Sequence, residues 1–347
     1  MKKFLILVAG LSLTAASCNI LGGGSGPKGV FKSEDGGQTF IASNKLDKKG
    51  DINGLNVNTL TYDPIDPDVM YIGSSSGIHK TEDAAATWKF ILTGIRVGDI
   101  AIDPSKTDII YAAGVSGDNG RILKTIDGGA TWKDIYVEPT KKNPVLSLGI
   151  SPANSRIILA GLNNGEIIRS TDEGNTWQLV RDLANPIIDL DYSDYTTAHA
   201  LAQSKGLFTT TDQGSNWSEV PSIVTLAPGS QVKTSSANVY YDAVYDSKLK
   251  GVIFLATQQG LLRSVDNGAT WSLMTLPVTN ETLTVSSAAV NPTNSNNIII
   301  AIGSTMFKTL NGGVTWETRK LPTQQPVMQI LINPQEPNNI YLGMGTR

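Results

Sequence analysis

One nine-residue pattern recurs seven times in this 347-residue chain, about once every 45 residues. Its most regular copies read KTIDGGATW (124–132), RSTDEGNTW (169–177) and RSVDNGATW (263–271). The other copies are KSEDGGQTF (32–40), KTEDAAATW (80–88), TTTDQGSNW (209–217) and KTLNGGVTW (308–316). A fixed period of this length is typical of solenoids and propellers, in which each repeat contributes one supersecondary unit.

Each repeat contains four short runs of strand-forming residues. Around the third copy they are 98–102, 109–113, 121–125 and 131–135, separated by Gly, Pro and Asp. Such runs predict a four-stranded antiparallel meander, whose strands we name A to D in chain order. Strand A ends in a proline turn in several repeats, as in LTYDP (60–64) and LGISP (148–152). After residue 28, no segment shows a helical period.

The repeated motif lies at the predicted C–D hairpin. Its acidic side chain can accept hydrogen bonds from the turn's own N–H groups and from the nearby Ser or Thr hydroxyl. The glycine permits a positive φ, and the tryptophan can fill the wedge between neighbouring sheets. We expect the central residues to be structural rather than catalytic, because they recur in every repeat. They are Asp35, Asp83, Asp127, Asp172, Asp212, Asp266 and Asn311.

The pattern S/T-x-D-x-G-x-T-W resembles the Asp-box, or BNR repeat. Asp-boxes occur in sialidases, xyloglucan-cleaving glycosidases, sortilin-type receptors and photosystem II assembly factors. All of these are β-propellers, so the resemblance implies a propeller over residues 29–347, with its ligand site on the face away from the boxes. Four residues depart from the pattern, and each is expected to weaken its own hairpin only: Phe40, Ala85, Asn216 and Asn311.

The two ends of the chain indicate how many blades there are. The first repeat has only strands C and D (29–40), and the last segment has only strands A and B (327–343). Together they make one blade, so we predict a single all-β, seven-bladed propeller closed by pairing the N-terminal and C-terminal strands. Such closure removes open sheet edges.

The N-terminus has the features of an export signal. Lys2 and Lys3 precede an apolar stretch (4–13), and small residues then lead to Cys18, the only cysteine. This order resembles a bacterial lipobox, which predicts a signal peptide over 1–17, lipidation of Cys18 and a Gly-rich tether over 18–28. We therefore expect an exported lipoprotein, held by its lipid at the periplasmic or extracellular side of a membrane.

Residues typical of catalysis are scarce. The two histidines, His79 and His199, lie in predicted strands and are expected to pack in the core, so we predict no metal site and no cofactor. The net charge of −3 does not suggest nucleic-acid binding. Sialidases also carry a Phe-Arg-Ile-Pro motif, which this chain lacks. Xyloglucan-cleaving enzymes usually use two propellers, yet a paired-carboxylate glycosidase remains an alternative.

The loops on the face opposite the Asp-boxes are rich in basic residues. The predicted D–A and B–C connections carry twelve cations and six anions. We expect an anionic protein or glycan to bind there. The candidate partner-binding residues are Lys48, Lys49, Arg96, Lys141, Lys142, Arg181, Lys205, Arg319 and Lys320. Two of the D–A loops are long, 41–56 and 221–238.

Two functions follow from the sequence. The first is a non-enzymatic binding or assembly scaffold at the cell envelope, with no catalytic residues. The alternative is a carbohydrate-active protein, either a lectin-like binder or a glycoside hydrolase of the sialidase or xyloglucanase type. A carboxylate pair at the mouth of the central channel with aromatic rings beside it would favour the alternative, and a flat basic surface the first.

Overall fold

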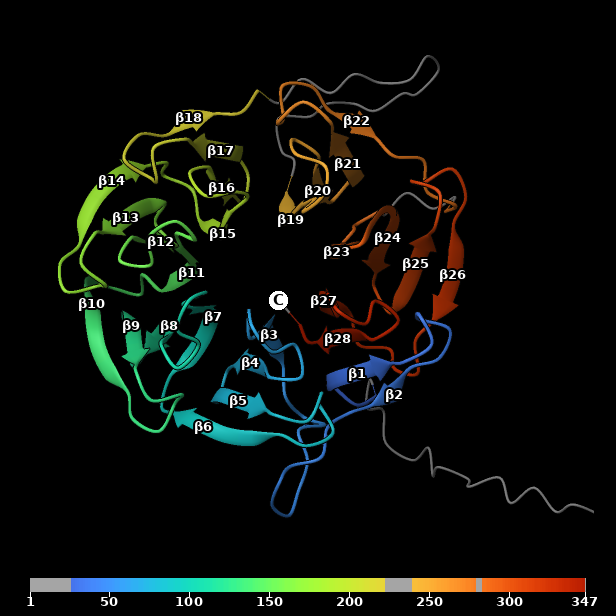
Figure 1. Cartoon of the computed structure of the whole chain (residues 1–347), viewed down its shortest axis with the longest axis horizontal. Coiled ribbons are helices and arrows are strands. Elements are labelled where there is room, and N and C mark those ends of the chain that lie inside the picture. The colour runs from blue at the N-terminus through green and yellow to red at the C-terminus, as the bar shows by residue number, and fades with distance from the viewer. Residues whose placement is uncertain (1–25, 222–238, 279–282, 347) are drawn as a thin grey trace, which may run out of the picture.

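The computed structural model describes residues 26–221, 239–278 and 283–346. In this part of the chain, 28 strands form seven four-stranded antiparallel sheets arranged as blades around a central channel (Figure 1). The fold predicted from the sequence is confirmed. No helix long and apolar enough to cross a bilayer occurs within the described ranges. The predicted signal peptide, Cys18 and most of the 221–238 loop lie outside them.

Six blades are built from consecutive strands in the order A, B, C, D, from the channel outward. Blade 1 comprises β3 (Val57–Tyr62), β4 (Met70–Ser74), β5 (Gly77–Thr81) and β6 (Lys89–Thr93), and blade 2 comprises β7 (Arg96–Ile102), β8 (Ile110–Ser116), β9 (Asn119–Thr125) and β10 (Lys133–Lys141). Blade 3 comprises β11 (Val145–Ile150), β12 (Ile158–Leu162), β13 (Glu166–Ser170) and β14 (Gln178–Asp182), and blade 4 comprises β15 (Ile187–Tyr192), β16 (Ala198–Ala202), β17 (Gly206–Thr210) and β18 (Ser218–Glu219). Blade 5 comprises β19 (Tyr240–Tyr245), β20 (Ile253–Thr257), β21 (Gly260–Ser264) and β22 (Ser272–Leu273), and blade 6 comprises β23 (Ser287–Asn291), β24 (Asn294–Ile302), β25 (Thr305–Thr309) and β26 (Glu317–Lys320).

Blade 7 is assembled from both ends of the chain. Its strands are β27 (Val327–Ile332), β28 (Ile340–Met344), β1 (Gly29–Ser33) and β2 (Ile41–Ala42), in the sheet order β2-β1-β28-β27. The β1–β28 pairing runs from Gly29 opposite Met344 to Ser33 opposite Ile340. This is the predicted closure, and it leaves the ring without an open gap between its first and last blades (Figure 1).

The hydrophobic core lies between adjacent blades. One cluster joins Leu159 and Ile167 of blade 3 to Ile187 and Leu190 of blade 4, and the other clusters are built in a similar way. The B strands β4, β12, β16, β20 and β28 are buried along their whole length, whereas the D strand β14 is largely exposed. Each blade therefore depends on its neighbours for burial of its apolar surface.

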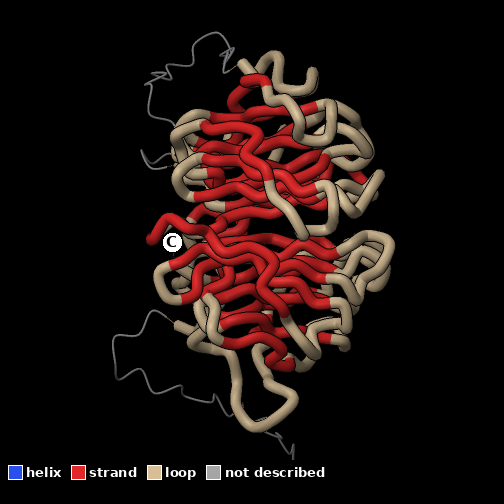
Figure 2. The backbone as a smooth tube through the Cα atoms, turned by 90° about the vertical axis from the view of Figure 1, so that its left-hand side faces the viewer, coloured by secondary structure: helices blue, strands red, loops and turns tan. Residues whose placement is uncertain are grey.

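The strand connections divide the ring into two faces. We call the side that carries the D–A and B–C connections the D–A face, and the side that carries the A–B and C–D connections the Asp-box face. Figure 2 shows the ring from its edge, with the C-terminal end on the left-hand side, which is the D–A face.

The Asp-box aspartates bind their own turns. Asp127 Oδ1 accepts hydrogen bonds from Thr125 Oγ1 (2.7 Å) and from the Thr131 N–H (2.8 Å), and Oδ2 accepts one from Thr131 Oγ1 (2.6 Å). The departures from the motif keep this network, because Asn216 Nδ2 donates to Asp212 Oδ2 (2.7 Å) and Asn311 Nδ2 donates to Thr315 Oγ1 (2.8 Å). Amide side chains thus replace the missing groups at these two hairpins.

Two consecutive residues after each central Asp or Asn adopt a positive φ. In blade 2 they are Gly128 (66°) and Gly129 (98°), and in blade 1 they are Ala84 (53°) and Ala85 (66°). The sequence pattern predicted this conformation only for the second position. Alanine is strained there by contact of its Cβ with the backbone, so blade 1 holds an unfavourable turn.

In blades 2, 3 and 6, the basic residue at the start of the motif joins its own box to the next one. Lys124 Nζ lies 3.0 Å from Glu173 Oε2 of the next blade, and Arg169 Nε donates to the Gln213 carbonyl (2.8 Å). Lys308 Nζ donates to the Gly36 carbonyl (2.7 Å) across the blade 6–blade 7 boundary. These contacts give the repeated cation a structural role on the Asp-box face.

Candidate functional site

The A strands line the central channel, and one polar position recurs in all seven. In most blades it directly follows a β-bulge in the A–B pairing, such as the register shift between Val97 and Asp99. The residues at this position form a ring around the channel: Thr59, Asp99, Ser147, Asp189, Asp242, Ser287 and Gln329.

Most ring side chains bind the backbone of the next blade. Asp99 Oδ2 accepts from the Leu148 N–H (2.8 Å), and Asp242 Oδ2 accepts from the Ala288 N–H (3.1 Å). Gln329 Oε1 accepts from the Leu60 N–H (2.6 Å), and Asp189 accepts from the Ala243 N–H. The ring thus links the A strands of neighbouring blades, and we call these contacts the inter-blade hydrogen bonds.

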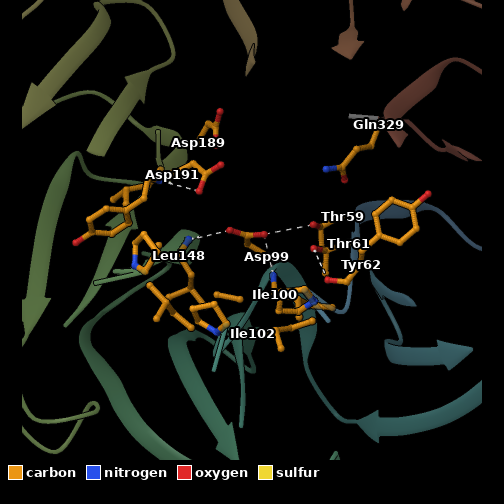
Figure 3. A pocket seen from close by; sticks show the side chains of 18 residues that line it. Thr59, Thr61, Tyr62, Asp99, Ile100, Ile102, Leu148, Asp189, Asp191 and Gln329 are labelled. Carbon is orange, nitrogen blue, oxygen red and sulfur yellow. Dashed lines mark hydrogen bonds between the residues drawn. The ribbon is translucent and has the colours of Figure 1, made fainter. Parts of the chain in front are cut away.

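Two cavities meet at this ring. The one toward the Asp-box face has a volume of about 370 Å³, and its lining includes Asp99, Asp189, Asp191, Tyr62 and Tyr192 (Figure 3). The other, toward the D–A face, has a volume of about 300 Å³. Its lining includes Tyr241, Asp242, Met328 and Thr346. The cavities share Thr59, Asp99, Asp189 and Gln329, so the channel is acidic at its middle.

The channel carboxylates are protonated more easily than free ones. Burial raises the pKa of Asp99 and of Asp191 to about 6. It also raises the pKa of Asp189 well above its ordinary value, and the charges of Asp242, Asp191 and Asp99 add to the effect. The Asp191 side chain is exposed to solvent within the channel, so its raised pKa changes the stability of the fold less than it would for a fully buried carboxylate. It accepts from the N–H of its own neighbour, Tyr192 (2.7 Å), and, unlike the ring carboxylates, from no N–H of the next blade among the described residues.

Both histidines lie in the core, as predicted. The His199 ring stacks on Tyr245 at a centroid distance of 4.6 Å, and its Nε2 lies 3.0 Å from Ser193 Oγ. His79 packs edge-on against Phe90. Burial lowers the pKa of each histidine to about 4, which keeps the rings neutral. Within the described ranges, no group of three or more His, Cys, Asp or Glu side chains could hold a metal ion.

On the D–A face, two of the predicted partner-binding residues line one cleft. Arg96 of blade 2 and Lys142, which leads into blade 3, line a cavity of about 530 Å³ together with Asp118 and Asn163. Neither cationic side chain forms a hydrogen bond or ion pair with any part of the chain that the structure describes. Lys142 has a φ of 60°, and its N–H donates to the Asp118 carbonyl (2.7 Å).

Blade 2 forms one wall of this cleft because its strands are longer. β9 has seven residues, whereas the C strands of the other blades have five. The β8–β9 pairing continues to Ser116 opposite Asn119, and β10 reaches Lys141. The hairpin therefore extends toward the D–A face, beside the segment that contains Lys142.

The remaining predicted residues are spread around the face. Lys48, Lys49, Arg181 and Lys320 are exposed. Others are engaged: Lys205 Nζ donates to the Leu183 carbonyl (2.5 Å), Arg319 pairs with Glu317 (3.4 Å) and Lys141 lies 3.9 Å from Asp118. The structure also places Glu166 and Glu219 at strand ends on this face, so its positive excess is smaller than the loop sequences suggest.

Sequence reasoning missed the ring of channel side chains. The available signal was a polar residue inside each otherwise apolar A strand, as at Asp99 in RVGDIAI and Gln329 in VMQILI. Its meaning depends on the neighbouring blade, which supplies the N–H group, and sequence periodicity does not show that contact.

Comparison with known proteins supports the propeller fold but does not establish a function. No family model matches the chain. A curated xyloglucanase from Paenibacillus sp is 32% identical over 139 residues, which span 32% of this chain but only 13% of that protein. The chain therefore corresponds to a small part of this relative.

Two solved structures give the structural context. The GH74 enzyme of Niastella koreensis superposes with a TM-score of 0.68 at 16% identity, covering 93% of this chain and 53% of the enzyme. YCF48 bound to D1 peptide superposes with a TM-score of 0.63 at 15% identity, covering 87% of this chain and 96% of YCF48. At such identities the likeness shows the fold alone. The chain thus shares its propeller fold with both GH74 xyloglucanases and the YCF48 assembly factor.

Proposed function

We propose that this chain is a non-enzymatic binding or assembly protein that recognises an anionic partner on its D–A face. The observation that carries the proposal is the cleft between blades 2 and 3, where Arg96 and Lys142 lie without an ion-pair partner among the described residues. Unpaired cations beside a cavity attract carboxylates, and an arginine can bind one with two parallel hydrogen bonds.

The channel carboxylates support this choice over catalysis. Asp99, Asp189 and Asp242 each accept an N–H from the next blade, so all three have structural roles. Among the channel carboxylates that the structure describes, Asp191 alone forms no inter-blade hydrogen bond. Glycoside hydrolysis normally needs two carboxyl groups with separate roles. The near full-length coverage of YCF48, a protein with a bound peptide, also supports a single propeller acting as a binder.

The test is charge reversal in the cleft. The variant Arg96→Glu/Lys142→Glu should lose capture of the partner from native membranes, because both attractive charges become repulsive. The matched control is Lys106→Glu/Lys250→Glu, which reverses two exposed charges on the Asp-box face. Once the partner is purified, we expect the cleft variant to weaken binding at least tenfold. If the cleft variant binds the partner as tightly as the wild type does, the proposal is wrong.

We also propose that residues 1–17 are removed and that Cys18 carries the lipid, from the order of basic, apolar and small residues before that cysteine. Intact-mass measurement of protein from membranes should show an acylated chain that begins at residue 18. The Cys18→Ser variant should lack the acyl mass and leave the membrane fraction. An unmodified Cys18 would refute the anchor without bearing on the cleft.

One observation favours a carbohydrate-active protein as the second candidate. Asp189 and Asp191 line the same cavity as Tyr62 and Tyr192, so carboxylates and aromatic rings lie together in the channel. Release of reducing ends from xyloglucan by the wild type, abolished by Asp191→Asn, would establish this function in place of the first. Without release, sugar affinity measured by calorimetry would decide whether the channel is lectin-like.

A further inference from the structure

The described chain begins at a fixed place on the D–A face. The Lys28 N–H donates to the Asn53 carbonyl (2.7 Å), and Asn44 Nδ2 donates to the Lys28 carbonyl (2.8 Å). Thr323 Oγ1 donates to the Pro27 carbonyl (2.8 Å). Residues 26–28 are therefore held between two loops, one over 43–56 and the other over 321–326, and the preceding chain must leave from this point.

This attachment point limits the distance between the D–A face and any lipid on Cys18. Cys18 lies eight residues before Gly26. Even a fully extended chain of that length spans at most ~28 Å. A lipid at Cys18 therefore keeps the part of the D–A face around residues 26–28 close to the membrane surface.

Cationic side chains outnumber carboxylates in and beside the loops that hold the attachment point. The first carries Lys45, Lys48 and Lys49, and Lys320 comes directly before the second. Two carboxylates, Asp47 and Asp51, lie in the same region. Lys48, Lys49 and Lys320 are exposed and form no ion pair with the described residues. We call Lys28, Lys45, Lys48, Lys49 and Lys320 the anchor-side cations.

We propose that the anchor-side cations bind anionic phospholipid headgroups, so that the lipidated propeller lies with its D–A face turned toward the membrane. This inference rests on the proposed lipidation of Cys18 for its orientation, whereas headgroup binding depends only on the charges. Each cation near an anionic surface raises membrane affinity about fivefold. Headgroups are the favoured occupant because the short tether brings them to these lysines, which stand on exposed loops and line none of the cavities described above.

The orientation bears on the partner as well. The cleft with Arg96 and Lys142 lies between blades 2 and 3, while the attachment point lies beside blades 6, 7 and 1 (Figure 1). Both are on the D–A face. A partner in the cleft would then be bound at the membrane surface, as expected for an acidic segment of another membrane protein.

The test measures vesicle binding without the lipid. The probe is the chain from residue 18 onward carrying Cys18→Ser, which contains all seven blades. It should sediment with vesicles of phosphatidylcholine mixed with phosphatidylglycerol, and not with phosphatidylcholine alone. High salt should release it, because exposed charges are screened. Equal sedimentation with both vesicle types would overturn the proposal.

The variant Lys48→Glu/Lys49→Glu/Lys320→Glu should weaken binding to the anionic vesicles at least tenfold. All three side chains are exposed, so its melting temperature should match the parent. Lys106→Glu/Lys250→Glu should bind as the parent does, and so should Arg96→Glu/Lys142→Glu, which separates this surface from the cleft. Undiminished binding by the triple variant, or failure of the parent to bind the anionic vesicles, would refute headgroup recognition.

Discussion

The carboxylate of Asp99 accepts a hydrogen bond from the backbone N–H of Leu148, 2.8 Å away in the next blade. The same carboxylate accepts the Ile100 N–H (2.8 Å), so it holds its own strand and the neighbouring one together. Gln329 likewise links blade 7 to blade 1, because its Oε1 accepts the Leu60 N–H (2.6 Å). The polar ring therefore stabilises the packing of neighbouring blades, and this role needs no ligand.

Removing an inter-blade hydrogen bond should destabilise the propeller. Asp99→Ala leaves the Leu148 N–H without its acceptor, at a cost of about 1–3 kcal/mol for a buried donor. Asp99→Asn keeps an acceptor oxygen and should cost less. Urea unfolding at pH 7 compares the two variants with the wild type. If Asp99→Ala unfolds at the same urea concentration as the wild type, the inter-blade hydrogen bonds do not contribute to stability.

Asp191 should make stability depend on pH. Its pKa is about 6 in the fold, against 3.8 as the ordinary value. The folded state binds more protons between these values, so this group stabilises the fold as the pH falls from 8 toward 4. Asp191→Asn mimics the protonated group, and it also removes a charge that raises the pKa of Asp189. The variant should therefore melt above the wild type at pH 8, with the difference shrinking by pH 5.

The difference between the two proteins is the quantity to measure, because the histidines act in the opposite direction. His79 and His199 have folded pKa values of about 4, below the ordinary 6.5. Their contribution to stability is lost as the pH falls below 6.5, in wild type and variant alike. A difference in melting temperature that stays constant from pH 8 to pH 5 would contradict the raised pKa of Asp191.

The strained turn of blade 1 offers a stabilising substitution. Ala84 and Ala85 have positive φ values of 53° and 66°, which glycine adopts without strain. Ala84→Gly should raise the free energy of unfolding by roughly 0.5–1 kcal/mol, since the relieved strain exceeds the added chain entropy. The matched control is Gly128→Ala in blade 2, whose φ is 66° and which should be destabilised. If denaturant unfolding shows the free energy of unfolding changing in the same direction for both variants, backbone strain does not control the stability of these turns.

Deleting the last two strands should open the ring. A chain that ends at residue 326 lacks β27 and β28, so β1 keeps only β2 as a partner and blade 6 loses the apolar surface of Ile330 and Leu342. Because each blade is buried by its neighbours, we expect a broad transition at a lower temperature in calorimetry. A truncated protein with an unchanged, cooperative melt would contradict closure through blade 7.

The sequence alone determined the architecture, because the information is local and repeated. Seven boxes such as 124–132 mark seven C–D hairpins, and the two half-repeats at 29–40 and 327–343 define blade 7. Each hairpin forms from hydrogen bonds within a few residues, as at Asp127 and Thr131, so periodicity alone is enough to find it.

Only the tertiary structure decided which polar residues meet. Asp99 and Leu148 are 49 positions apart, and Arg96 and Lys142 lie on successive blades. Their proximity depends on the rotation between blades, on the bulge at Val97 and Asp99, and on the extra length of β9. Those features set where side chains of separate repeats converge, and a periodic pattern does not encode them.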